Sequence, residues 1–119
     1  MTPCITFIAH GSQKKEANNF LETLIAEISA GSGGVNLGFL GPGSPTIPEA
    51  LESHIQKRGA KTVRIVPLFL IPGKHLVCDI SAIIEGVKNR FPSVDLKLEE
   101  FVGNLPQFKN LLKSIISLS

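Results

Sequence analysis

Residues 5–12 read ITFIAHGS, a short apolar run that ends at once in His10, Gly11 and Ser12. An apolar run of this length that stops at a turn signal is typical of a buried β-strand. Residues 14–30 then place apolar side chains three and four positions apart, which is typical of a helix with one buried stripe. A strand, a sharp polar turn and an amphipathic helix together indicate the start of an α/β fold.

The alternation of strand and helix continues to the end of the chain. Further strands are predicted at 35–40, 61–66 and 94–100, and further helices at about 48–58, 75–90 and 105–118. Pro48 suits the first turn of its helix, and Gly59 lies just beyond the predicted end. We therefore predict one domain over residues 1–119, a three-layer α/β sandwich whose four-stranded parallel sheet has the flavodoxin-like order 2-1-3-4.

The composition argues against several classes of protein. The 119 residues carry a net charge of +2 and include no Trp or Tyr, whereas a nucleic-acid surface needs a dense basic patch or exposed aromatic rings. The two cysteines do not form a disulfide framework. No apolar stretch approaches the roughly 18 residues of a membrane span, and the first residues do not resemble a signal peptide. We expect a cytoplasmic protein with no nucleic-acid partner and no membrane partner.

Two histidines follow predicted strands that should be neighbours in the sheet. Ligands of open α/β sheets bind outside the carboxyl ends of the strands at a switch point, here between the first and third strands. His10 follows the first strand directly, and His75 follows the third at the entrance to a helix. Neutral imidazole is a good ligand for divalent cobalt, nickel, iron and zinc. The sequence therefore predicts that His10 and His75 converge as a metal-handling pair.

Structural interpretations of the same residues stay open at this point. A His-Gly pair after a strand can be only a polar turn, and His75 can simply begin a helix. We expect His54 to face solvent from the polar side of its helix. Cys78 lies three residues after His75 and could be a soft ligand, but a half-buried structural thiol is the favoured interpretation.

Three segments resemble the sirohydrochlorin chelatases of the CbiX type. Residues 8–12, followed by Ala17, Asn18 and Phe20, resemble the opening signature of that family. Residues 66–70, 73–75 and 79–80 together resemble the second signature of the family. The segments 39–40 and 45–51 match the part of the family pattern that lies between the two signatures. The likeness spans nearly the whole chain and keeps its order and spacing.

The resemblance implies a chelatase-like fold and the insertion of a divalent metal into sirohydrochlorin. The metal is commonly Co²⁺, on the way to cobalamin, while relatives use Fe²⁺ for sirohaem or Ni²⁺. His10 and His75 match the two catalytic, metal-binding histidines of the family. A chain of this length resembles the short form, which is a homodimer with symmetric sites.

Further side chains are expected to bind the tetrapyrrole. The apolar loop 68–71 could pack on a face of the macrocycle, and lysines beside the two histidines could meet its peripheral carboxylates. The predicted substrate-binding residues are Ser12, Lys14, Lys15, Phe69 and Lys74.

The chain departs from the family pattern after its Phe39-Leu40 pair. The family usually has an acidic residue there, and this chain has Gly41. Glu49 matches the pattern but should lie on a helix, too far along to replace it. A non-catalytic tetrapyrrole or metal carrier on a chelatase scaffold is therefore the alternative function. A histidine phosphotransferase is disfavoured, because it needs arginines for the phosphate and none lies near His10 in sequence.

Overall fold

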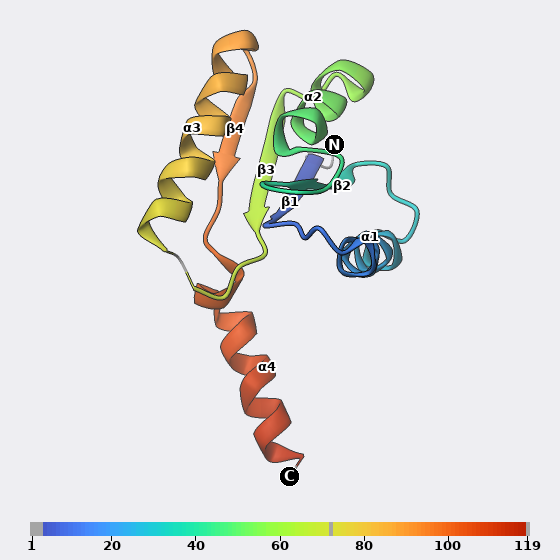
Figure 1. The fold of residues 1–119 in the computed structure, drawn as a ribbon, viewed down its shortest axis with the longest axis vertical. Helices are drawn as coiled ribbons and strands as arrows, with labels where there is room; N and C mark the ends of the chain where they lie inside the picture. The colour runs from blue at the N-terminus through green and yellow to red at the C-terminus, as the bar shows by residue number, and fades with distance from the viewer. Residues whose placement is uncertain (1–3, 72, 119) are drawn as a thin grey trace.

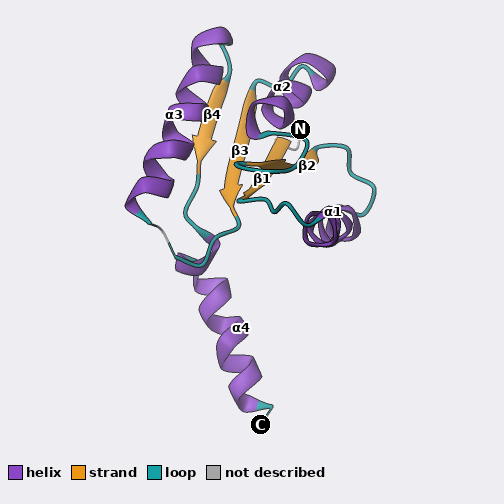
Figure 2. Ribbon diagram, in the orientation of Figure 1, coloured by secondary structure: helices purple, strands orange, loops and turns teal. Residues whose placement is uncertain are grey.

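The computed structural model describes residues 4–71 and 73–118, and its elements alternate as the sequence predicts (Figures 1 and 2). They are β1 (Cys4–Ala9), α1 (Lys15–Ser29), β2 (Val35–Phe39), α2 (Ile47–Arg58), β3 (Thr62–Pro67), α3 (Lys74–Arg90), β4 (Asp95–Leu98), the 3-10 helix η1 (Val102–Asn104) and α4 (Pro106–Ser117). The four strands are parallel and lie in the order β2-β1-β3-β4, which confirms the predicted topology. In the part of the chain that the structure describes, no helix is both long and apolar enough to cross a bilayer.

The side chains of the central strand β1 alternate between two cores, as the period of two in a strand requires. Ile8 belongs to the larger core, which includes Ile65 of β3 and is covered by α2 and α3. Ala9 belongs to the smaller core, which includes Phe39 of β2 and is covered by α1. Helices therefore cover both faces of the sheet, and the predicted three layers are present.

Helix α2 begins one residue before its predicted start and ends at the predicted residue. The Thr46 hydroxyl accepts a hydrogen bond from the Glu49 amide, and the Glu49 carboxylate accepts one from the Thr46 amide at 2.8 Å. This capping box satisfies two amides that the helix itself leaves unbonded, and it holds the pKa of the Glu49 carboxyl below its usual range. Gly59 ends the helix with a φ of 62°, which favours glycine. Glu49 is thus engaged in holding a helix terminus.

Helix α4 extends away from the sheet instead of packing on it (Figure 1). Its main contact with the rest of the chain is η1, an element that the sequence did not predict. The radius of gyration is 14.8 Å, against about 13.5 Å for a compact chain of this length. On the sheet face that bears α1, strand β3 presents Arg64, which forms an ion pair with Glu99 just beyond the end of β4. This part of the face is charged and offers little to the apolar side of a helix.

Candidate functional site

His10 and His75 lie at the same edge of the sheet. His10 comes directly after Ala9, the last residue of β1, and His75 lies in the first turn of α3, which follows β3. Strands β1 and β3 are adjacent and parallel, with Ile8 beside Pro67, so both segments leave the sheet at its carboxyl edge. Both side chains are exposed to solvent. This edge is where open α/β sheets bind their ligands.

The loop that carries His10 is joined to the loop after β2. The Gly41 amide donates to the His10 carbonyl oxygen at 2.7 Å, and the Leu40 amide donates to the Ala9 carbonyl oxygen at 2.8 Å. Gly11 has a φ of +91°, and a Cβ on it would lie 2.2 Å from the carbonyl oxygen of Pro42. Only glycine accommodates both the backbone conformation and this close approach. The two loops therefore form one tightly packed unit beside the His10 side chain.

The Asn18 side chain, in the first turn of α1, bonds to both loops. Its Oδ1 accepts from the Ser12 amide at 2.9 Å, and its Nδ2 donates to the carbonyl oxygens of Ser12 at 2.8 Å and Pro42 at 3.3 Å. The family resemblance includes Asn18 but predicts no role for it. An amide side chain on the helix turn directly after a glycine-containing loop is a signal that could have indicated its bonds to Ser12.

Position 41 lies beside the imidazole of His10. A Cβ on Gly41 would be 3.8 Å from Nδ1 and 3.9 Å from Cε1 of that ring. A side chain at position 41 would thus extend next to His10, at the place where the resemblance leads one to expect a carboxylate. Over residues 4–71 and 73–118, no group of three or more His, Cys, Asp or Glu side chains gathers that could hold a metal ion.

The apolar loop after β3 divides into an inward and an outward part. The Phe69 ring packs against the Phe101 ring with 5.7 Å between ring centroids. The backbone carbonyl oxygen of Phe69 accepts a hydrogen bond from the Gly103 amide at 3.0 Å. Leu70 and Ile71 are 61% and 79% exposed. The apolar surface that this loop offers to a ligand therefore comes mainly from Leu70 and Ile71, with Phe69 holding the loop to η1.

The predicted lysines are available at the carboxyl edge. One directly precedes His75, and the other two lie four and five residues after His10. All three are exposed and form no ion pair with any residue that the structure describes. These side chains are Lys14, Lys15 and Lys74. Ser12 is half-buried, and its hydroxyl accepts from the Lys14 amide at 3.1 Å.

The structure overturns two side-chain predictions. His54 is 2% exposed instead of facing solvent, and its Nε2 donates to the carbonyl oxygen of Ile5 at 3.1 Å. Burial lowers the pKa of its imidazole. Position 54 lies four residues after Ala50 and three after Leu51, both buried, so helical spacing places it on the buried stripe. Cys78 is exposed, not half-buried.

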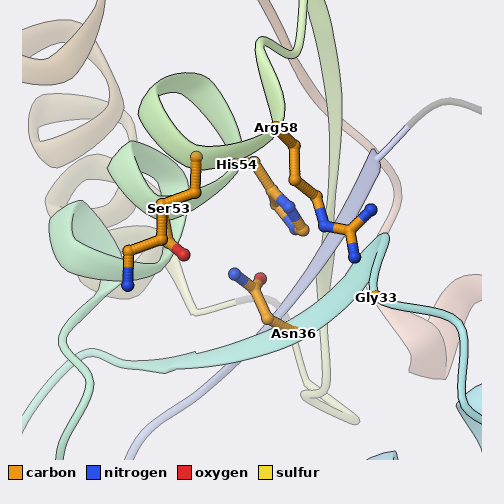
Figure 3. Close-up of a pocket in the computed structure, with 6 residues that line it drawn as sticks. Gly33, Asn36, Ser53, His54 and Arg58 are labelled. Atoms are coloured by element: carbon orange, nitrogen blue, oxygen red, sulfur yellow. The ribbon is translucent and has the colours of Figure 1, made fainter.

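A polar pocket of about 570 Å³ lies at the amino edge of the sheet, opposite His10 (Figure 3). It is lined by Gly33, Asn36, Ser53, His54, Lys57 and Arg58. The Arg58 guanidinium lies across Gly33, where a Cβ would be only 1.3 Å from its Nη2. Lys57 and Arg58 lie in the last turn of α2, where positive charge complements the helix dipole. We therefore interpret this edge as part of the scaffold.

The family model for CbiX matches residues 4–117 of the sequence. The chain belongs to the CbiX family. This CbiX chain is 34% identical over 107 residues to the sirohydrochlorin ferrochelatase of Bacillus subtilis, an alignment that covers 87% of the chain and 40% of that relative. The chain thus spans well under two thirds of the length of this curated relative.

Two solved structures share the fold of this CbiX chain. The sirohydrochlorin chelatase SirB of Bacillus subtilis subspecies spizizenii, in complex with cobalt, has a TM-score of 0.82 at 27% identity, covering 98% of this chain and 49% of SirB. The cobalamin biosynthesis CbiX protein of Marinobacter aquaeolei VT8 has a TM-score of 0.83 at 22% identity. That likeness covers 98% of this chain and 95% of the other. The fold therefore occurs both in a chain of this length and within a chain about twice as long.

Proposed function

We propose that this CbiX chain is a cytoplasmic sirohydrochlorin chelatase that inserts a divalent metal, with Co²⁺ as the first candidate and Fe²⁺ or Ni²⁺ as alternatives. The observation that carries the proposal is the common position of His10 and His75 at the carboxyl edge of the sheet in a chain of this family. Similar proteins bear the names sirohydrochlorin ferrochelatase and sirohydrochlorin chelatase in complex with cobalt, so the similarity leaves the choice of metal open.

Metallation requires loss of two pyrrole protons and exchange of metal-bound water for ring nitrogens. His10 and His75, both exposed, hold the metal substrate and accept the protons in turn. The packed loops around Gly11 and Asn18 fix the backbone of His10, so that its ring returns to one position in each turnover.

The surroundings of the two histidines suit a flat, apolar ring with anionic substituents. Leu70 and Ile71, with Phe69 behind them, contact a face of the macrocycle. The peripheral carboxylates meet the positively charged side chains at this edge and the hydroxyl of Ser12. The positive side chains are Lys14, Lys15 and Lys74.

Residues 1–119 form one chelatase-like domain in this proposal, and the working unit is a homodimer. The chain covers 49% of SirB at a TM-score of 0.82, so two copies reach the length of that relative. A closed twofold dimer is the commonest arrangement for a soluble homo-oligomer. Each copy then contributes one carboxyl edge to a symmetric assembly.

The direct test is anaerobic absorption spectroscopy of sirohydrochlorin mixed with Co²⁺, and separately with Fe²⁺. We expect the protein to accelerate metal insertion over the rate without protein, and the His10→Ala and His75→Ala variants each to lose about 100-fold of that rate. Equal rates with and without protein would contradict a chelatase.

The alternative function is a carrier of the tetrapyrrole or of the metal, favoured by one observation. Gly41 leaves the space beside the His10 ring without a carboxylate. A carrier would change the absorption spectrum of sirohydrochlorin on mixing but would leave the rate of metal insertion at its protein-free value. The same absorption experiment therefore distinguishes a chelatase from a carrier.

A further inference from the structure

The backbone of the loop after β3 lies directly on η1, at a position where only glycine leaves room (Figure 1). A Cβ on Gly103 would lie 1.9 Å from the carbonyl oxygen of Leu70 and 2.7 Å from its Cα, far closer than such atoms approach in folded proteins. Gly103 is not among the glycines with a positive φ, so other residues can adopt its backbone conformation. The close approach to Leu70 is therefore what requires glycine at position 103.

The segment around η1 is a firm support for this loop. Phe101, directly before η1, is 5% exposed and belongs to the larger core. Its ring packs on that of Phe69, and the Gly103 amide donates to the Phe69 carbonyl oxygen. The Asn104 side chain donates to the Glu100 carboxylate at 2.9 Å across the same turn. A ring contact, a hydrogen bond and a close backbone contact thus join the loop to η1.

The side chains that this support holds in place are apolar and lie near the second candidate histidine. Leu70 and Ile71 are mostly exposed. The Ile71 carbonyl oxygen accepts a hydrogen bond at 3.0 Å from the amide of Gly73, the residue directly before α3. His75 lies two residues further on, in the first turn of that helix. The contact with η1 therefore fixes an apolar surface next to the start of α3.

We propose that Gly103 is a positioning residue for the tetrapyrrole, because it lets the loop lie on η1 and so sets where Leu70 and Ile71 meet the macrocycle. This inference rests on the proposed function, in which those two side chains contact the ring. With a Cβ at position 103, the Leu70 backbone would have to move by about 1 Å to restore an ordinary separation. A displacement of about 1 Å can cost up to about 100-fold when it moves a group that positions a substrate.

A titration of sirohydrochlorin without metal measures the affinity that this proposal concerns, and it needs no chelatase activity. We expect Gly103→Ala to bind about 10-fold more weakly than the wild type. The matched control is Gly86→Ala on α3, where nothing lies within 4 Å of the added Cβ, and it should bind as tightly as the wild type. Phe69→Leu loosens the same contact without a backbone clash and should also weaken the affinity. Circular dichroism checks that each variant is folded, and Phe69→Leu decides the matter if Gly103→Ala is not.

A double-mutant cycle shows whether Gly103 acts through the two apolar side chains. Leu70→Ala/Ile71→Ala removes the contact with the macrocycle and should weaken binding at least about 10-fold. Adding Gly103→Ala to that variant should then change the affinity by less than about twofold, since the side chains that it displaces are already absent. A further loss of the full 10-fold would overturn the proposal. An affinity of Gly103→Ala equal to that of the wild type would overturn it as well.

The methyl resonances of Leu70 and Ile71 in an NMR spectrum test the positioning without a ligand. They should shift in Gly103→Ala and keep their wild-type values in Gly86→Ala. Unshifted resonances in Gly103→Ala would overturn the positioning role while leaving the proposed function intact. A wild type that does not bind sirohydrochlorin would overturn the proposed function and, with it, the ligand assigned to this loop.

Discussion

Two histidines at opposite ends of β1 serve different purposes. His54 lies at the amino end, 2% exposed, with its Nε2 bonded to the carbonyl oxygen of Ile5. His10 follows the carboxyl end and is exposed, although the backbone around it is fixed by hydrogen bonds to the neighbouring loop. The imidazole of His54 is a structural hydrogen-bond donor, whereas the imidazole of His10 is exposed on a backbone that is held in place. An exposed histidine on a well-ordered loop is therefore the better candidate for binding a ligand, and the buried histidine is better explained by stability.

The largest effect should come from loosening the loop at the carboxyl edge. Gly11→Ala introduces a Cβ that meets the Pro42 carbonyl oxygen at 2.2 Å on a residue with a φ of +91°. We expect metal insertion to fall about 100-fold because His10 is displaced, with a loss of about 1–3 kcal/mol in the free energy of unfolding.

Gly59→Ala is the matched control for that substitution. Gly59 also has a positive φ, 62°, but nothing lies within 4 Å of the added Cβ. It should cost about 1 kcal/mol of stability and leave the rate unchanged. A Gly11→Ala protein that inserts metal at the wild-type rate would contradict the role given to this loop.

Removing the Asn18 side chain should have the next largest effect. Asn18→Ala loses three hydrogen bonds that join the loops after β1 and β2. We expect a rate about 10-fold lower, because a small displacement of a catalytic group is costly. Asn18→Asp keeps the acceptor for the Ser12 amide, so its rate of metal insertion should lie between those of the wild type and Asn18→Ala. The His10 ring resonances in an NMR spectrum should shift in Asn18→Ala, and unshifted resonances would argue against positioning.

The buried imidazole of His54 at the amino edge should make the stability of the fold depend on pH. Because burial lowers the pKa of His54 in the folded protein, the unfolded chain binds more protons once the pH falls below the ordinary histidine pKa of about 6.5. The free energy of unfolding should therefore decrease between about pH 7.5 and 5.5, by at most about 1.4 kcal/mol per pH unit. His54→Gln, which can still donate to Ile5, should flatten this dependence in urea titrations. An equally steep dependence in the variant would assign it to other groups.

The smallest effect concerns the exposed lysines of the carboxyl edge. If they contact the carboxylates of the tetrapyrrole, the affinity of the protein for the tetrapyrrole should weaken as salt is added. Salt weakens the attraction between exposed charges, with a screening length of about 10 Å at 0.1 M. The triple variant with Gln at all three positions should bind more weakly and lose the salt dependence. An affinity that is flat in salt for the wild type would remove these side chains from the site. The positions are Lys14, Lys15 and Lys74.

The strand order and the position of both candidate histidines could be predicted, because alternating patterns determine a parallel sheet and its carboxyl edge. The burial of His54 could also have been predicted, because it lies four residues after Ala50 and three after Leu51, on the same side of the helix. The contact of Asn18 with the Pro42 carbonyl oxygen could not, since it depends on two loops that meet only in the folded chain. The direction of α4 could not be predicted either, because an apolar stripe in a sequence does not identify the surface that covers it.

The assignment of the reaction to His10 is tested most directly by comparing His10→Ala with His54→Ala in two measurements, the rate of Co²⁺ insertion into sirohydrochlorin and the free energy of unfolding in urea. We predict that His10→Ala loses about 100-fold in rate with nearly unchanged stability. We predict that His54→Ala loses about 1–3 kcal/mol of stability while the folded fraction retains the wild-type rate. A His10→Ala protein that inserts cobalt as fast as the wild type would contradict the assignment of the reaction to the carboxyl edge of β1.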